Sequence, residues 1–194
     1  YFVINRGRQY GKTTMLKALE DYLKEDYTVV SLDFQEIGTE EFRDAAGFTR
    51  AFARLIKRAF EGRNGNTASD LTEQLGHFAG NDAEFTLGEL FAHISKICAA
   101  SVKPVVMMID EVDSASNNQV FIDFLALLRS YYLDRKNKPI FWSVILAGVY
   151  DIKNLKLKMR SDAEHQYNSP WNIAADFDVN MSFSVDEIAV MLRE

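Results

Sequence analysis

Apolar and polar residues follow two different periods along the chain, and the changes between them predict an α/β fold. Short, mostly apolar runs suit strands of a covered sheet, and longer segments with apolar residues three or four positions apart suit helices. The expected strands are residues 2–4, 27–34, 105–109 and 139–148, with a fifth at 177–183, where apolar and polar residues alternate. The expected helices are residues 12–25, 41–61, 71–79, 87–101 and 117–133, followed by one that closes the chain.

Strands separated by helices are typical of a parallel sheet with helices on both faces, which is a three-layer sandwich. The sequence shows no internal repeat and no low-complexity tract, so we expect residues 1–194 to form a single domain. The chain begins inside an apolar run and stops within a helical pattern. We therefore expect it to be truncated at both ends and to be part of a longer protein.

Composition excludes several classes of protein. With 47% hydrophobic residues, the chain can bury a substantial core, and it has no apolar run long enough for a transmembrane helix. The net charge of −6 argues against broad non-specific binding of nucleic acid, although it leaves a local basic groove open. Cys98 is the single cysteine, which excludes an internal disulfide framework and fits the reducing cytoplasm. We expect its thiol to be buried.

The first sixteen residues, YFVINRGRQYGKTTML, carry the first candidate site. An apolar run, a basic loop that ends in Gly-Lys-Thr, and a helical pattern follow one another as in the phosphate-binding P-loop. Backbone N–H groups of such a loop turn toward phosphate oxygens, and the helix N-terminus adds partial positive charge. Arg6 occupies the position of the usual first glycine and Gly7 comes one residue late, so the segment is a variant loop or a chance Gly-Lys-Thr.

The loop motif also predicts which residues would hold a nucleotide and its metal ion. Lys12 would reach the β- and γ-phosphates, and the Thr13 hydroxyl would bind Mg²⁺. Backbone amides of the loop would surround the phosphates. The expected nucleotide-binding residues are Arg8, Gln9, Tyr10, Gly11, Lys12, Thr13 and Thr14.

A second motif, VVMMIDEVD, places two acids directly after an apolar strand, at the edge where α/β proteins bind ligands. Asp110 would be the Walker B acid, which holds Mg²⁺ opposite Thr13. Glu111 would orient and deprotonate an attacking water. Acids after a strand also commonly cap the next helix, and we expect Asp113 and Ser114 to do so.

Three segments, INRGRQYGKTT, MMIDEVD and SVILAGVYDIKNLK, together resemble the AAA-like P-loop ATPases of the additional-strand catalytic-glutamate group, related to STAND and archaeal-type ATPases. Loops of this family often have arginine in place of the usual first glycine, which makes Arg6 a family trait. The resemblance covers essentially the whole chain. It implies a five-stranded parallel sheet in the order 5-1-4-3-2, whose third strand carries Asp110 and Glu111.

The resemblance also implies residues that are harder to assign. AAA+ proteins have a polar sensor near the end of the fourth strand, and the candidates here are Ser143 and residues 150–151. An arginine finger would contact phosphate from the same or a neighbouring subunit. Arg160, in a polar loop, is the candidate, and a merely solvated arginine is the alternative.

These observations predict an ATPase that uses ATP and Mg²⁺, with Lys12 and Glu111 as catalytic residues. Hydrolysis would drive conformational change in a partner or an attached C-terminal effector domain, and self-assembly is a further expectation. The alternative is a slow or non-hydrolysing nucleotide-gated switch, as in STAND proteins. A small-molecule kinase is less favoured because kinases usually lack an Asp-Glu pair here. A GTPase is disfavoured because no Asn-Lys-x-Asp guanine motif is present.

Overall fold

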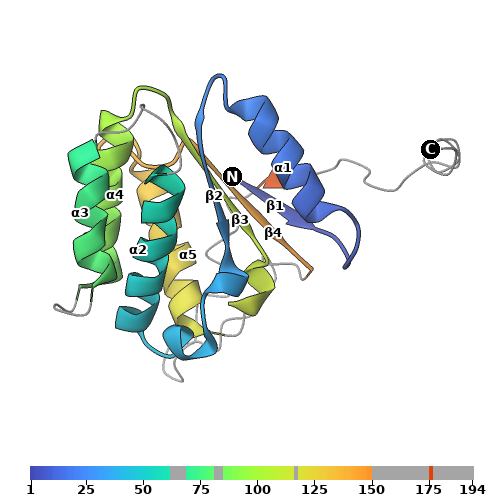
Figure 1. The fold of residues 1–194 in the computed structure, drawn as a ribbon, viewed down its shortest axis with the longest axis horizontal. Helices are drawn as coiled ribbons and strands as arrows, with labels where there is room; N and C mark the ends of the chain where they lie inside the picture. The colour runs from blue at the N-terminus through green and yellow to red at the C-terminus, as the bar shows by residue number, and fades with distance from the viewer. Residues whose placement is uncertain (62–68, 81–84, 116–117, 150–174, 177–194) are drawn as a thin grey trace, which may run out of the picture.

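The computed structural model describes residues 1–61, 69–80, 85–115, 118–149 and 175–176 (Figure 1). Its strands are β1 (Phe2–Asn5), β2 (Thr28–Asp33), β3 (Val105–Asp110), β4 (Ser143–Gly148) and the two-residue β5 (Ala175–Asp176). They form one sheet in the order β2-β3-β4-β1-β5, and each pair of neighbours is parallel.

The predicted α/β fold with a parallel sheet is confirmed, and β1 to β4 follow the expected order 1-4-3-2. These four strands contain four to six residues each. The predicted full-length fifth strand at 177–183 is not shown: at the edge beside β1, the described residues form only the two-residue bridge of Ala175 and Asp176. The alternating run at 177–183, which predicted the strand, and the closing helix lie outside the described residues.

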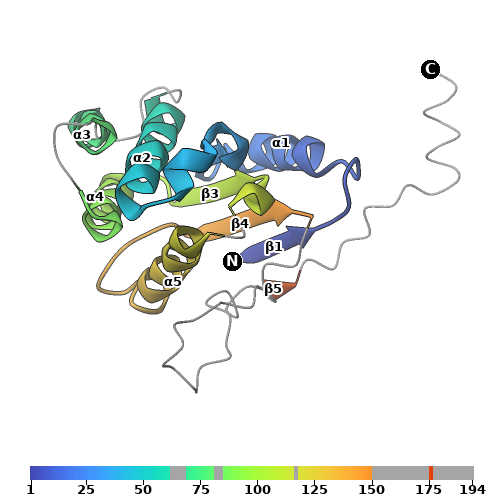
Figure 2. The ribbon, with the colours of Figure 1, turned by 90° about the horizontal axis from the view of Figure 1, so that it is seen from below.

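Helices cover both faces of the sheet. They are α1 (Lys12–Leu23), α2 (Ala45–Glu61), α3 (Ser69–Ala79), α4 (Leu87–Ala100) and α5 (Gln119–Leu133). Figures 1 and 2 show α1 alone on one face, with α2, α4 and α5 on the other. Helix α3 packs outside this layer, against α2 and α4. None of the helices in these ranges combines the length and hydropathy needed to cross a bilayer.

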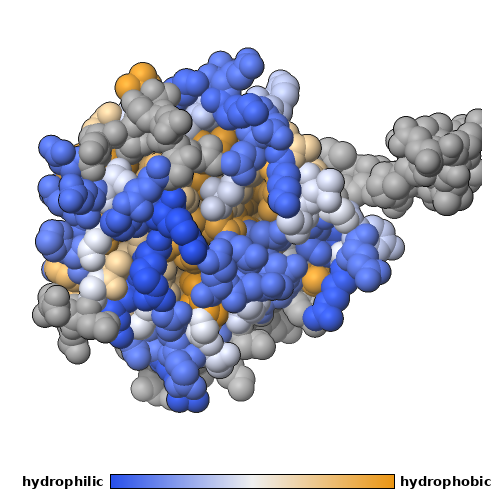
Figure 3. Space-filling model, viewed as in Figure 1, coloured by the Kyte–Doolittle hydropathy of each residue, from blue (hydrophilic) through white to orange (hydrophobic). Residues whose placement is uncertain are grey.

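The two faces of the sheet bury separate cores, which explains why β3 is apolar throughout. Val106 and Met108 face α1, whereas Val105, Met107 and Ile109 belong to the larger core on the other face. The larger core is rich in buried phenylalanines: Phe34, Phe42, Phe48, Phe52, Phe60, Phe91, Phe121 and Phe124. The outer surface seen in Figure 3 is mostly hydrophilic, and hydrophobic atoms appear mainly in the hollow between α1 and α2.

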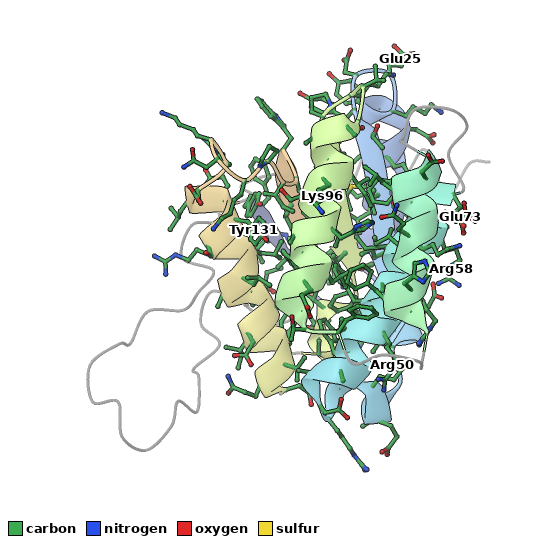
Figure 4. All side chains as sticks on the ribbon, turned by 90° about the vertical axis from the view of Figure 1, so that its left-hand side faces the viewer. Glu25, Arg50, Arg58, Glu73, Lys96 and Tyr131 are labelled. Atoms are coloured by element: carbon green, nitrogen blue, oxygen red, sulfur yellow. The ribbon has the colours of Figure 1, made fainter. Side chains whose placement is uncertain are left out.

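Helix α2 begins four residues later than predicted, because a short 3-10 helix, η2 (Thr39–Phe42), occupies the expected first turn. The Glu41 carboxylate accepts a hydrogen bond from the Gly38 amide (3.0 Å) and closes that turn. Three of the four basic side chains of α2 are paired with acids: Arg54 with Glu41, Lys57 with Glu61 and Arg58 with Glu36. Figure 4 shows Arg50 and Arg58 on the outer side of this layer, which agrees with a solvated face.

Local hydrogen bonds determine where α4 and β4 begin. The capping box that begins α4 is present, because Thr86 Oγ1 accepts from the Glu89 amide (3.2 Å) and the Glu89 carboxylate accepts from the Thr86 amide (2.8 Å). Strand β4, by contrast, begins at Ser143 rather than near residue 139. The preceding residues turn toward the sheet, where the Trp142 amide donates to the Val105 carbonyl (2.7 Å).

Candidate active site

The loop between β1 and α1, residues 6–11, leaves the carboxyl edge of the sheet and turns sharply into the helix (Figure 2). Gln9 and Gly11 both have left-handed backbone conformations, with φ of 64° and 71°. A Cβ at Gly11 would meet no atom within 4 Å, so glycine is favoured there by backbone conformation and not by lack of space. The Gly11 carbonyl accepts the first hydrogen bond of α1, from the Met15 amide (2.8 Å).

The Lys12 side chain folds back into this loop. Its Nζ donates hydrogen bonds to the carbonyl oxygens of Arg6 (3.1 Å) and Gly7 (3.0 Å), and the residue is only 6% exposed. The ammonium group therefore lies inside the curve of the loop, beside the N-terminus of α1. Fixed positive charge at this point favours an anion such as phosphate.

A direct contact joins the loop to the end of β3. Thr13 Oγ1 donates a 2.6 Å hydrogen bond to Asp110 Oδ2, although the two residues are 97 positions apart in the chain. The other carboxylate oxygen, Asp110 Oδ1, accepts from the Glu111 amide (2.9 Å). Asp110 is 8% exposed, so these contacts hold a largely buried carboxylate in one orientation.

Glu111 has an unusual backbone conformation that the sequence did not reveal. Its φ of 53° and ψ of 40° place it in the left-handed region, where non-glycine residues are uncommon. The turn is held by the short 3-10 helix η3 (Val112–Ser114), in which the Ser114 amide and hydroxyl donate to the Glu111 carbonyl (3.1 and 2.9 Å). The chain therefore bends away from the sheet directly after Asp110, and the half-buried Glu111 leaves β3 at this bend.

Asp113 and Ser114 do not cap the helix that follows them, which corrects the prediction. Helix α5 is preceded by Asn118, which makes no side-chain capping bond, whereas Asp113 Oδ2 accepts from the Val149 amide just beyond β4. Ser114 instead bonds within η3 and to the Phe34 carbonyl (3.2 Å). The acidic turn after β3 therefore contacts the neighbouring strand end rather than the next helix.

Gly148 is a site residue that sequence reasoning missed. A Cβ there would lie 2.9 Å from both Asp113 Oδ1 and Val112 Cγ2. Its carbonyl accepts from the Arg6 amide (3.2 Å), so the end of β4 contacts both the β1–α1 loop and η3. The only signal in the sequence was a glycine at the end of an apolar strand.

The structure brings some predicted residues together and places one elsewhere. Lys12, Thr13, Asp110 and the Glu111 backbone meet at the carboxyl edge of the sheet. Ser143, a candidate sensor, begins β4 and pairs with Val106, so it lies near the opposite edge. Ser143 is therefore about 13 Å from Asp110, measured along the strands. Arg160 and residues 150–151 lie outside the described residues.

The donor groups present suit one kind of metal site. A hydroxyl and a carboxylate are hard oxygen ligands, and Mg²⁺ is commonly held by one or two carboxylates together with substrate phosphates and water. Thr13 and Asp110 therefore fit Mg²⁺ accompanied by phosphate. Within the described ranges, no group of three or more His, Cys, Asp or Glu residues could hold a metal ion.

Comparison with known proteins gives the family. A family model described as an AAA-like domain matches residues 2–190, and the chain belongs to this family. Among solved structures, it is similar to the Walker-type ATPase PABY2304 of Pyrococcus abyssi, with 17% sequence identity and a TM-score of 0.48. The similarity covers 79% of this chain and 41% of that chain, so this chain spans about two fifths of the archaeal protein. A search of curated proteins found no match.

Proposed function

We propose that this chain binds ATP together with Mg²⁺ and hydrolyses it. The observation that carries the proposal is the 2.6 Å contact between Thr13 Oγ1 and Asp110 Oδ2. It unites a Gly-Lys-Thr loop with an acid at the end of a buried strand, which is the pairing that nucleotide and metal binding require. Membership of the AAA-like family supports the same assignment.

Each residue has a role in this proposal that follows from its chemistry. The Lys12 ammonium neutralises charge on the β- and γ-phosphates, and backbone N–H groups of residues 8–14 surround them. Thr13 and Asp110 would hold Mg²⁺, which would neutralise negative charge on the phosphates. Glu111 orients the attacking water and accepts its proton. Arg160 is proposed to supply the positive charge of an arginine finger.

The contacts in the described structure must be exchanged when nucleotide binds. Lys12 is held by the Arg6 and Gly7 carbonyls, and Thr13 and Asp110 hold each other. Phosphate would replace the carbonyls as the partner of Lys12, and Thr13 and Asp110 would exchange their mutual hydrogen bond for binding of Mg²⁺. We infer that this exchange changes the loop conformation and drives movement in a partner or an attached domain.

The same exchange favours a second candidate function, a nucleotide-gated switch that hydrolyses ATP slowly or not at all. In that case the loop conformation itself carries the signal. Both functions are compatible with the catalytic-glutamate group related to STAND ATPases, in which we place the chain. We further propose that residues 1–194 form one domain of a longer cytoplasmic protein, with a sheet of five strands.

Nucleotide binding is tested by Lys12→Ala, with Lys17→Ala as the matched control on an exposed position of the same helix. Isothermal titration with ATP and Mg²⁺ should show at least about tenfold weaker binding for Lys12→Ala, because a charge-assisted contact is lost. Lys17→Ala should bind like the wild type. Equal ATP affinity of all three proteins would refute the assignment of the loop.

Hydrolysis is tested by Glu111→Gln, with the exposed Glu40→Gln as control. Loss of a general base should lower the turnover number by about 10²- to 10⁴-fold and leave ATP affinity nearly unchanged. Equal turnover by Glu111→Gln and the wild type would remove Glu111 from the mechanism. Tight binding with negligible wild-type turnover would instead favour the switch.

A further inference from the structure

A cavity lies where the strands begin, at the end of the sheet opposite the proposed nucleotide site. It has a volume of about 560 Å³ and is lined by the start of β1, the end of α5 and the segment that leads into β4. Figure 2 shows the start of β1, marked N, beside α5, whereas the β1–α1 loop lies at the other end of the strand. This volume is in the range of small-molecule pockets, about 300–1,000 Å³.

The walls of this pocket are mainly aromatic. Phe2, Tyr132, Phe141 and Trp142 contribute to the lining. Trp142 is 67% exposed and Phe2 is 37% exposed, which is high for side chains of their size and polarity. Aromatic walls present flat apolar faces, against which a planar ring system can stack.

The backbone that carries these rings is held firmly. The Trp142 amide donates to the Val105 carbonyl (2.7 Å), and the Pro139 carbonyl accepts from the Ser95 hydroxyl. Tyr132 packs against the buried Tyr1, with ring centroids 4.6 Å apart and ring planes tilted by 45°. The connecting segment that carries Phe141 and Trp142 is therefore tied by hydrogen bonds to β3 and α4.

Among the described residues, Arg135 is the cationic side chain that lines this pocket. The Arg135 guanidinium lies over the Tyr132 ring, 4.5 Å from its centroid, and Arg135 lines the cavity. A guanidinium stacked on a ring keeps its N–H groups in its own plane, where they can bind a carboxylate or sulfonate. The adjacent Asp134 is already bonded to Lys138 and Asn137, and no carboxylate pairs with Arg135 within the described ranges.

We propose that this pocket binds a small molecule with a planar apolar body and one anionic group, such as an aromatic carboxylate or sulfonate. The exposed rings of Phe2 and Trp142 contact the apolar body, the buried Phe141 closes the wall behind them, and Arg135 binds the anion at the rim. This inference goes beyond ATP hydrolysis and does not depend on it, because the two sites lie at opposite edges of the sheet.

A pair of fluorescent probes tests both parts of the proposal in the full chain. 8-Anilinonaphthalene-1-sulfonate has the required ring system and anion, and N-phenyl-1-naphthylamine has the same rings without the sulfonate. Wild type should bind each probe saturably at one site. Arg135→Gln should weaken the sulfonate about tenfold, the effect of losing one charge-assisted hydrogen bond, and should leave the neutral probe unchanged. Trp142→Ala should weaken both probes.

Control variants separate this site from other sources of probe fluorescence. Lys136→Gln removes an exposed neighbouring charge and should bind both probes like wild type. Far-UV circular dichroism and urea midpoints should match across the variants, which excludes probe binding to unfolded chain. Saturating ATP with Mg²⁺ should not displace the sulfonate. Displacement by ATP, binding at many sites, no binding, or equal sulfonate affinity of Arg135→Gln and wild type would overturn the proposal.

Discussion

Replacing Gly148 by alanine would test whether the end of β4 controls the acidic turn after β3. The added Cβ would lie 2.9 Å from Asp113 Oδ1 and Val112 Cγ2, and ordinary van der Waals contact begins at 3.4 Å. Neighbouring atoms would therefore have to move by about half an ångström. Neither can yield easily, because Val112 is fully buried and Asp113 is bonded to the Val149 amide.

Overpacking of this kind costs about 1–3 kcal/mol of unfolding free energy. Urea denaturation should show this loss for Gly148→Ala, with an unchanged m-value. The matched control is Gly88→Ala, near the start of α4, where an added Cβ would meet only Thr86 Oγ1 at 3.9 Å. Because alanine is the better helix former, this control should be more stable than the wild type, by up to about 1 kcal/mol.

The same substitution has a functional consequence under the proposed mechanism. Val112 and Asp113 directly follow Glu111, so a shift of η3 would displace the proposed base. ATP turnover should fall by about tenfold or more, since small displacements of reacting groups are costly. ATP affinity should fall less. A Gly148→Ala protein with wild-type stability would refute the packing argument, and normal turnover despite lower stability would refute the link to Glu111.

Three further predictions concern packing, titration and reactivity. Phe34→Ala should lower the free energy of unfolding, measured in urea, by about 3–5 kcal/mol. Phe34 is fully buried, and the centroids of neighbouring phenylalanine rings lie 6.0–6.4 Å from its own. An unchanged free energy of unfolding would contradict this prediction. Hydrogen bonds from the Thr86 amide and hydroxyl lower the pKa of the Glu89 carboxyl. The ionised Glu89 carboxylate therefore stabilises the fold at neutral pH, and this stabilisation is lost as the pH falls through the lowered pKa. The stability difference between wild type and Glu89→Gln should therefore narrow below about pH 4 in urea titrations, and a constant difference would contradict the cap. Cys98 is partly buried against the larger core, and desolvation raises the pKa of its thiol to about 12. Iodoacetamide should therefore label native protein slowly near neutral pH and unfolded protein quickly, and equal labelling would contradict a desolvated thiol.

Much of the architecture followed from patterns of nearby residues. Mostly apolar runs located β2 and β3 to within one residue, and the helical spacing of apolar residues located the start of α4. These signals are reliable because strand and helix formation depend on side chains a few positions apart. Predictions were less accurate where a short 3-10 turn replaced the first turn of α2.

In the candidate site too, some features follow from the sequence and others depend on the tertiary structure. The sequence by itself determined its ingredients, because a Gly-Lys-Thr loop before a helix and two acids after an apolar strand are local patterns. Only the tertiary structure decided how they meet: the Thr13–Asp110 contact spans 97 positions and depends on the sheet order that puts β4 between β1 and β3. The contact of Asp113 with the Val149 amide has the same origin, because it joins the ends of two strands that are distant in sequence. Local propensity has no influence on which strand ends meet.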